Sequence, residues 1–276
     1  MYFDTHVHFD LIKSEGGPEG VIARALAAGV TRMVAVGGNE QANAFAMSLA
    51  AKFPNSIRAA IGYDRDRAME HCPMDQLEAM LIGPAVDTSH IANSRIGMIR
   101  SAAIGEIGLD FHYHPETSAE QQALFAAQLS IARRLRLPVI VHNREADGPM
   151  LELLREHSLA WSSGGGGIGV LHCFTGNVAM ARSILDLGFC ISFSGIVTFR
   201  NAESLRDVAG FVPADRILIE TDTPLLAPVP LRGQPNEPAN LPLVAKVVAG
   251  CRGCRVEEIA ELTSCNAGKL FGMSTS

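Results

Sequence analysis

The sequence has no long apolar run and no leader of the secretory type. No stretch approaches the roughly 18 uninterrupted apolar residues that a membrane-spanning helix requires. The N-terminal segment, MYFDTH, lacks the basic and apolar regions of a signal peptide. We therefore expect a cytoplasmic protein without a membrane segment.

Cysteine is sparse for a chain of this length, with six residues at positions 72, 173, 190, 251, 254 and 265. This density is too low for the disulfide framework of a small secreted domain, so we expect reduced thiols. Cys251 and Cys254 have the spacing of a zinc or redox pair, but no second pair or nearby histidine completes four ligands. A structural role is expected for both.

Basic residues are scarce too, because 23 lysines and arginines stand against 29 aspartates and glutamates, which leaves a net charge of −6. Affinity for a nucleic-acid backbone comes mainly from clustered basic side chains. The composition thus argues against a general nucleic-acid platform, and any DNA substrate would have to be held locally.

The apolar pattern predicts an α/β fold. A chain of 276 residues that is 47% apolar can bury one large core, so we expect a single domain over residues 1–276. Runs typical of strands recur eight times, at 3–5, 32–36, 57–61, 102–105, 138–141, 169–171, 189–193 and 217–220. Helical spacing occurs at 21–28, 43–52, 119–135, 150–157, 178–186, 202–210, 242–250, 256–262 and 265–271. Alternating strands and helices predict a (β/α)8 barrel of the TIM type; an open doubly wound sheet is the alternative.

Three segments depart from short barrel connections. Residues 64–100 leave room for one helix and a polar loop at 87–94, and loops on the catalytic face of a barrel usually set substrate choice. Residues 162–167, Ser-Ser-Gly-Gly-Gly-Gly, are typical of a flexible surface insertion. The proline-rich segment 223–240 predicts an irregular loop.

Histidines and carboxylates cluster at the carboxyl ends of the predicted strands. Two follow the first strand, and one each stands at the end of the fourth, fifth, sixth and eighth strands: His6, His8, Glu106, His142, His172 and Asp222. These strand ends meet at one mouth of a parallel barrel, where barrel enzymes keep their active sites. As unpaired buried groups they would be costly, whereas one or two divalent cations would satisfy all six. The sequence therefore predicts a metal site at the mouth.

Residue spacing assigns roles within this site. His6 and His8 lie on the same side of a strand, because side chains alternate with period two, and they can share one metal ion. Asp222 would complete the ligands of that ion and accept the proton of an attacking water. Two ions at bridging distance would clamp the attacking and leaving oxygens of a displacement.

A second ion needs a bridging ligand. Related barrel hydrolases often use a carboxylated lysine, but none of the four lysines lies at a predicted strand end. Glu106, within Gly-Glu-Ile-Gly, is the one carboxylate at the end of the fourth strand and is expected to bridge to an ion held by His142 and His172. Two dications would exceed the charge of Glu106, Asp222 and one hydroxide, which favours an anionic substrate such as a phosphodiester.

Arg144 stands two residues beyond His142 and could bind a phosphate oxygen through its guanidinium group, together with the backbone of the Thr175-Gly176 turn. The alternative is a surface ion pair between Arg144 and Glu145 or Asp147.

Five linked motifs follow one another along the chain: Asp4-Thr5-His6-Val7-His8, Gly105-Glu106-Ile107-Gly108-Leu109-Asp110, Pro138-Val139-Ile140-Val141-His142-Asn143-Arg144, His172-Cys173-Phe174-Thr175-Gly176 and Glu220-Thr221-Asp222-Thr223-Pro224. In this order they resemble the TatD family of metal-dependent hydrolases, within the amidohydrolase-like barrel superfamily. The resemblance implies a site with two metal ions, magnesium, manganese or zinc, and deoxyribonuclease activity, commonly from the 3′ end of single strands. Arg232 and Glu237 match a loop pattern of the family, which implies a contact with substrate or with residues around the metals.

One motif departs from the family. The family typically has Gly-x-His-Pro after the third strand, where this chain has Gly62-Tyr63-Asp64-Arg65, so a residue that often faces the metal pocket is expected to be missing. This departure and the long 64–100 connection bear on specificity. We expect ordinary loop roles for His112 and His114.

The leading hypothesis is a phosphodiesterase of the deoxyribonuclease type with two divalent ions, which acts on single-stranded DNA or a small phosphodiester and needs no stable protein partner. Its catalytic residues would be Glu106 and Asp222, and its substrate-binding residues Arg144 and Arg232. One alternative is an amidohydrolase or lactonase that acts on a small carbonyl substrate. Another is a metal-binding scaffold without catalysis.

Overall fold

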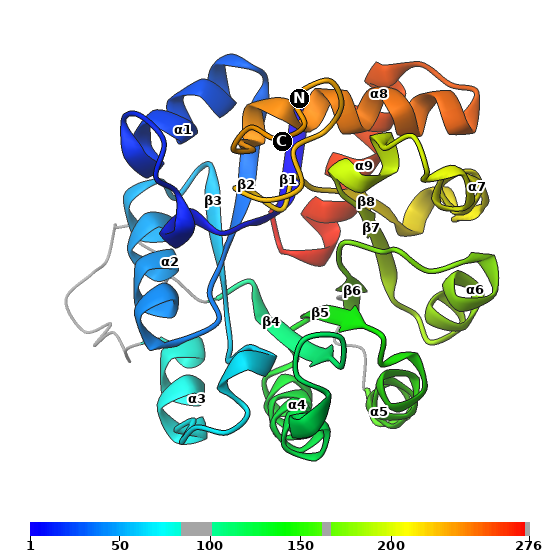
Figure 1. Ribbon diagram of the computed structural model, residues 1–276. Coiled ribbons are helices and arrows are strands. Elements are labelled where there is room, and N and C mark those ends of the chain that lie inside the picture. Colours follow the sequence, from blue (N-terminus) through cyan, green and yellow to red (C-terminus); the bar gives the residue numbers. More distant parts are fainter. Residues whose placement is uncertain (84–100, 162–166, 274–276) are drawn as a thin grey trace.

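The computed structural model describes residues 1–83, 101–161 and 167–273. Eight parallel strands form one sheet in the order of the chain, ringed by helices (Figure 1). The strands are β1 (Tyr2–Val7), β2 (Val30–Val36), β3 (Ile57–Ile61), β4 (Ala103–Asp110), β5 (Val139–Arg144), β6 (Gly169–Leu171), β7 (Cys190–Phe193) and β8 (Ile217–Ile219). The helices are α1 (Gly17–Ala27), α2 (Glu40–Lys52), α3 (Met74–Ile82), α4 (Ser118–Leu135), α5 (Asp147–Leu159), α6 (Val178–Asp186), α7 (Glu203–Phe211), α8 (Leu241–Arg252) and α9 (Val256–Leu270). The predicted barrel is confirmed.

The first strand and the segment after the last strand meet at the mouth. Val7 and Thr223 form a parallel bridge, and the His8 amide donates to the Thr223 carbonyl at 2.9 Å. The Asp222 amide donates to the His6 carbonyl at 3.1 Å. These backbone bonds bring the segments that carry His6, His8 and Asp222 together.

The amino ends of the strands are covered by the end of the chain. Phe3, near the start of β1, packs against Phe271 just after α9, with ring centroids 6.1 Å apart. Ala267 and Leu270 of α9 join the same buried cluster, and α9 crosses behind the barrel in Figure 1. This packing leaves the carboxyl ends of the strands for the functional site.

Three strands extend beyond the ends expected from the sequence. β1 includes His6, β4 continues past Glu106 to Asp110, and β5 includes His142 and Arg144. The prediction that Glu106 and His142 end their strands was wrong, because it stopped each strand at its last apolar run. Polar residues continue the backbone ladder here, since Gly108 pairs with His142.

The C-terminal region also differs from expectation. Two helices were expected at 256–262 and 265–271, but α9 is one continuous helix. The side chains of Thr263 and Ser264 satisfy their hydroxyls without interrupting it: Thr263 donates to the Ile259 carbonyl at 2.8 Å, and Ser264 donates to the Met1 carbonyl at 3.2 Å.

The three long or irregular connections predicted from the sequence agree with the structure over their described residues. The connection after β3 contains a short 3-10 turn, η2 (Arg65–Arg67), and the expected helix α3. The 87–94 loop and residues 162–166 lie outside the described residues. Segment 223–240 is irregular apart from a 3-10 turn, Pro238–Asn240. All six cysteines are free, as expected. Within the described ranges, no helix is long and apolar enough to cross a membrane.

His157 on α5 makes stability dependent on pH. Its side chain is fully buried beside the rings of Trp161 and Phe189, and its Nδ1 lies 3.4 Å from the Arg133 guanidinium. Burial, aided by Arg133, lowers the pKa of His157 from 6.5 to about 4. Between these values the unfolded chain binds a proton that the folded chain does not, so stability falls as the pH drops through this window.

We expect a His157→Leu variant to lose less stability than the parent between pH 7.5 and 4.5, by about 2–3 kcal/mol. Urea unfolding at both pH values measures the difference. His71→Leu, at an exposed position, is the matched control and should behave like the parent. An equal pH dependence in the His157 variant and the parent would contradict this assignment.

Candidate metal centre

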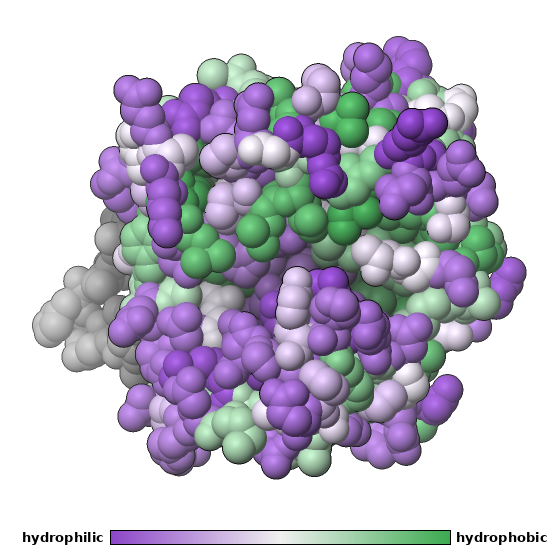
Figure 2. All heavy atoms as spheres, in the orientation of Figure 1, coloured by the Kyte–Doolittle hydropathy of each residue, from purple (hydrophilic) through white to green (hydrophobic). Residues whose placement is uncertain are grey.

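The six predicted site residues converge at the mouth of the barrel. Five of them line a cavity of about 620 Å³, namely His8, Glu106, His142, His172 and Asp222. His6 lies beneath it without exposed surface. Figure 2 shows a hollow near the centre of one face of the molecule. The cavity is of the size that small-ligand sites usually have.

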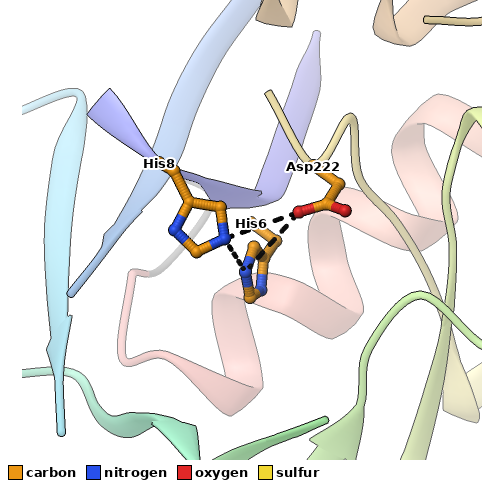
Figure 3. A group of neighbouring side chains, drawn as sticks. All are labelled: His6, His8 and Asp222. Carbon is orange, nitrogen blue, oxygen red and sulfur yellow. Dashed lines mark hydrogen bonds and ion pairs between the residues drawn. The ribbon is translucent and has the colours of Figure 1, made fainter. Parts of the chain in front are cut away.

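His6, His8 and Asp222 form one group of potential ligands (Figure 3). The Nε2 atoms of His6 and His8 lie 3.0 Å apart, and Asp222 Oδ1 lies 3.5 Å from His8 Nε2 and 3.9 Å from His6 Nε2. Asp222 has a φ of 58°, in the left-handed region that aspartate tolerates better than most residues. The backbone thus turns here while the carboxylate faces the two imidazoles.

Glu106, His142 and His172 form a second group. Glu106 Oε1 lies 3.1 Å from His142 Nδ1 and 3.6 Å from His172 Nε2. The other oxygen, Oε2, lies 3.2 Å from His6 Nε2 and 3.3 Å from His8 Nε2. One carboxylate therefore stands between two pairs of histidines, which is the arrangement that a bridging ligand requires.

Two further carboxylates support the second group. Asp110 Oδ2 lies 3.2 Å from His142 Nε2, and Glu220 Oε1 lies 3.3 Å from His172 Nδ1. Glu220 also accepts a hydrogen bond from the Cys173 amide at 2.6 Å. Carboxylates behind imidazoles fix the orientation of the ring and raise its basicity. Neither residue was predicted as part of the site, although Asp110 follows Glu106 along β4 at an even spacing and Glu220 comes directly after β8.

The buried carboxylates of the cluster favour positive charge on the groups around them. Burial would lower the pKa of His8, but Asp222 and Glu106 outweigh it and raise this pKa to about 10. Burial is likewise outweighed at His172, where Glu106 and Glu220 raise the pKa to about 10. The two imidazoles thus carry protons that balance the buried carboxylates. Because a ligating imidazole must be neutral, a bound cation would take over that balance and release these protons.

The donor set fits divalent metal ions. Imidazole nitrogens and carboxylate oxygens around a common ion at about 2.0–2.2 Å lie about 3–3.5 Å from one another. The separations in the two groups run from 3.0 to 3.9 Å, close to this range. Imidazoles suit zinc, while carboxylates suit magnesium and manganese. Among the described residues, the candidate metal groups contain no cysteine, and the structural role expected for Cys251 and Cys254 stays a prediction.

Arg65 enters the site although it was not predicted to do so. It begins the η2 turn after β3, and its guanidinium donates to Glu106 Oε1. Burial would raise the pKa of Glu106, but Arg65 and His172 outweigh it and hold this pKa well below its usual range. The histidine of the family pattern is absent here, as the sequence indicates, with Asp64 in its place, and Arg65 reaches the pocket from the next position instead. The departure of Gly62-Tyr63-Asp64-Arg65 from the family pattern was the one feature of the sequence that pointed to a change at this part of the pocket.

Arg144 lies at the edge of the cavity, stacked over the ring of Tyr113 at 4.6 Å. The two acids expected as alternative partners are engaged elsewhere: Glu145 with His112 at 2.7 Å, and Asp147 with Asn143 at 2.7 Å. Within the described ranges, the Arg144 guanidinium therefore has no acidic partner, and its contact with a phosphate oxygen stays a prediction.

The other predicted contacts lie away from this cavity. Arg232 stacks over Phe199 at 3.7 Å and does not line the cavity, so substrate binding by Arg232 stays a prediction. Glu237 accepts from Arg24 at 2.7 Å, which ties its loop to α1. His112 and His114 pair with neighbouring glutamates, in keeping with ordinary loop roles.

Known proteins share both the sequence and the fold. Residues 3–272 match the family model of TatD related DNase. The uncharacterized metal-dependent hydrolase YcfH of Escherichia coli (strain K12) is 40% identical, over 99% of this chain and 96% of its own. The 3'-5' ssDNA/RNA exonuclease TatD of Rahnella sp. (strain Y9602) is 35% identical over 92% of each chain. The solved structure of YjjV, a TatD homologue from Escherichia coli K12, superposes with a TM-score of 0.85 at 30% identity and covers 99% of this chain and 98% of that one. The chain therefore belongs to the TatD-related family of metal-dependent hydrolases.

Proposed function

We propose that this protein is a phosphodiesterase that uses two divalent metal ions to release nucleotides from the 3′ end of single-stranded DNA. The observation that carries the proposal is the Glu106 carboxylate between two histidine pairs at the base of an open cavity. The name of the Rahnella relative, an exonuclease on single-stranded DNA and RNA, supports the choice of substrate.

The two groups of ligands would each hold one ion, with Glu106 shared: His6, His8 and Asp222 for the first, and Glu106, His142 and His172 for the second. Bound ions of this kind polarise a phosphoryl oxygen and lower the pKa of water. The chain itself fixes the ligand geometry, because Asp110 and Glu220 orient two of the imidazoles from behind.

Asp222 is placed to accept the proton of the attacking water. Burial would raise its pKa, but the hydrogen bond from His8 and the nearby charge of His6 outweigh burial and lower it. The carboxylate is therefore ionised at neutral pH. It also lines the cavity, so it is available to a proton released there.

Arg144 would bind a phosphate oxygen at the mouth. Stacking on Tyr113 limits the orientations of its guanidinium, which reduces the entropy lost on binding. The cavity also has an apolar lining, formed by Ile196, Leu225 and Leu226. These side chains would contact a base or sugar of the substrate. A protein with a net charge of −6 could hold DNA locally in this way.

The same apolar lining suits a second candidate function, hydrolysis of a small ester or lactone. Such a substrate would need no guanidinium contact, and its turnover would be insensitive to Arg144. A metal-binding scaffold without catalysis is the third reading, and the same assay tests it.

The test is nucleotide release from short single-stranded DNA labelled at the 3′ or 5′ end, with metal-stripped protein and added magnesium, manganese or zinc. Early loss of a 3′ label that depends on metal and on Arg144 is the expected result. Faster turnover of esters or lactones than of any nucleotide would favour the second candidate. Metal binding without hydrolysis of either DNA or esters and lactones would favour the non-catalytic scaffold.

A further inference from the structure

Arg65 is a fixed positive charge inside a cluster that otherwise attracts cations. Its side chain is only 19% exposed, and it contacts the carboxylate that stands between the two ligand groups. We propose that Arg65 weakens the metal position formed by Glu106, His142 and His172, so that the two positions of the centre differ in affinity. This inference rests on the metal centre of the proposed function and adds an order of occupancy to it.

The contact of Arg65 is confined to one half of the centre. Its guanidinium donates to Glu106 Oε1, the oxygen that faces His142 and His172. The other oxygen, Oε2, faces His6 and His8. A cation in the half formed by His142 and His172 therefore competes with Arg65 for the same oxygen, whereas a cation beside His6 and His8 does not.

The charge of Arg65 also persists when metal binds. A guanidinium does not deprotonate in proteins. Repulsion between Arg65 and a dication bound to Glu106 Oε1 therefore remains when metal enters. In the part of the chain that the structure describes, no guanidinium contacts Asp222 in the position formed by His6, His8 and Asp222.

The structure argues for weakening rather than loss of the second position. Asp110 and Glu220 still hold His142 and His172 in ligating orientations. Arg65 also has other acidic neighbours: Asp66 Oδ1 lies 3.9 Å from its Nε, and the charge of Asp64 lies close enough to favour the guanidinium. Among the described residues, that Nε has no hydrogen-bond partner. Arg65 can thus turn toward these acids when a second ion enters.

Isothermal titration of metal-stripped protein with Zn²⁺, and separately with Mn²⁺, tests this order. For the unmodified protein we expect two binding steps, the second at least about tenfold weaker than the first. Arg65→Gln should tighten the second step by about tenfold or more and change the first by less than about threefold. Arg65→Lys keeps the charge and should keep the second step weak.

Arg67→Gln is the matched control. Arg67 lies in the same η2 turn and loses the same charge on substitution, but it pairs with Glu40 and Glu70 on the surface and not with Glu106. Both binding steps should stay unchanged in this variant. Thermal unfolding followed by circular dichroism verifies that each variant is folded.

Equal affinity of the two steps in the unmodified protein would overturn the inference and would need no variant. So would an unchanged or weaker second step in folded Arg65→Gln, or the same tightening in Arg67→Gln. Each of these results leaves the proposed function intact, because two ions still bind. No metal binding at all would instead overturn both proposals.

Discussion

A Glu106→Gln variant is expected to lose nearly all metal-dependent hydrolysis, by roughly 10⁴-fold in kcat/KM, with the loss of both bound ions. Glutamine keeps the size of the side chain, but it removes the charge and replaces one carboxylate oxygen with an NH₂ group that cannot ligate a metal ion. Glu106 touches all four histidines of the centre, so one substitution affects both ligand groups. Metal chemistry contributes several kcal/mol to such reactions, and each 1.4 kcal/mol is a factor of ten.

The measurement combines hydrolysis of 3′-labelled single-stranded DNA with the metal content of the same protein after dialysis. Glu78→Gln is the matched control, because Glu78 is a carboxylate on α3 that pairs with Arg134 on the surface. It should keep parental activity, which shows that the loss is specific to Glu106, and the inactive Glu106→Gln protein prepared in the same way excludes a contaminating nuclease. A Glu106→Gln protein that retains two ions, or retains more than about a tenth of the activity, would contradict the bridging role.

Much of the fold could be predicted because the strands of a parallel barrel are recognisable from their apolar sequence pattern. Parallel strands buried on both faces need continuous apolar residues, and β6 and β3 were located to the residue on this basis. The site followed from the same rule, since the carboxyl ends of parallel strands converge. Polar residues directly after apolar runs, such as His172 after β6, could therefore be placed at one mouth before any contact was known.

The remaining features depend on contacts that local patterns do not encode. Arg65 follows a strand like many surface arginines, and only the packing of the η2 turn against β4 shows that it reaches Glu106. Within the continuous helix α9, the Ser264 hydroxyl donates to the carbonyl of Met1, a partner 263 residues away that no local pattern indicates. Strand ends were misjudged at β4 and β5 because buried polar residues there have partners from other strands, as Asp110 has in His142.

An Asp222→Asn variant is expected to bind metal more weakly and to lose about 10³-fold in kcat even when metal is saturating. Asparagine preserves the shape of the side chain and the unusual backbone turn at φ 58°, which asparagine also tolerates. The variant cannot accept a proton at neutral pH, and positioned general bases contribute roughly 10²–10⁴-fold. Loss of one charged ligand from the group with His6 and His8 adds the decrease in affinity.

Saturation with metal separates the two roles of Asp222. If the residue were only a ligand, excess Mn²⁺ would restore the parental kcat, and the role of proton acceptor would have to pass to another group. If it is the base, kcat stays low at every metal concentration, because added metal cannot replace the lost proton acceptor. A parental rate in the variant would remove Asp222 from the mechanism while leaving Glu106 as the bridge.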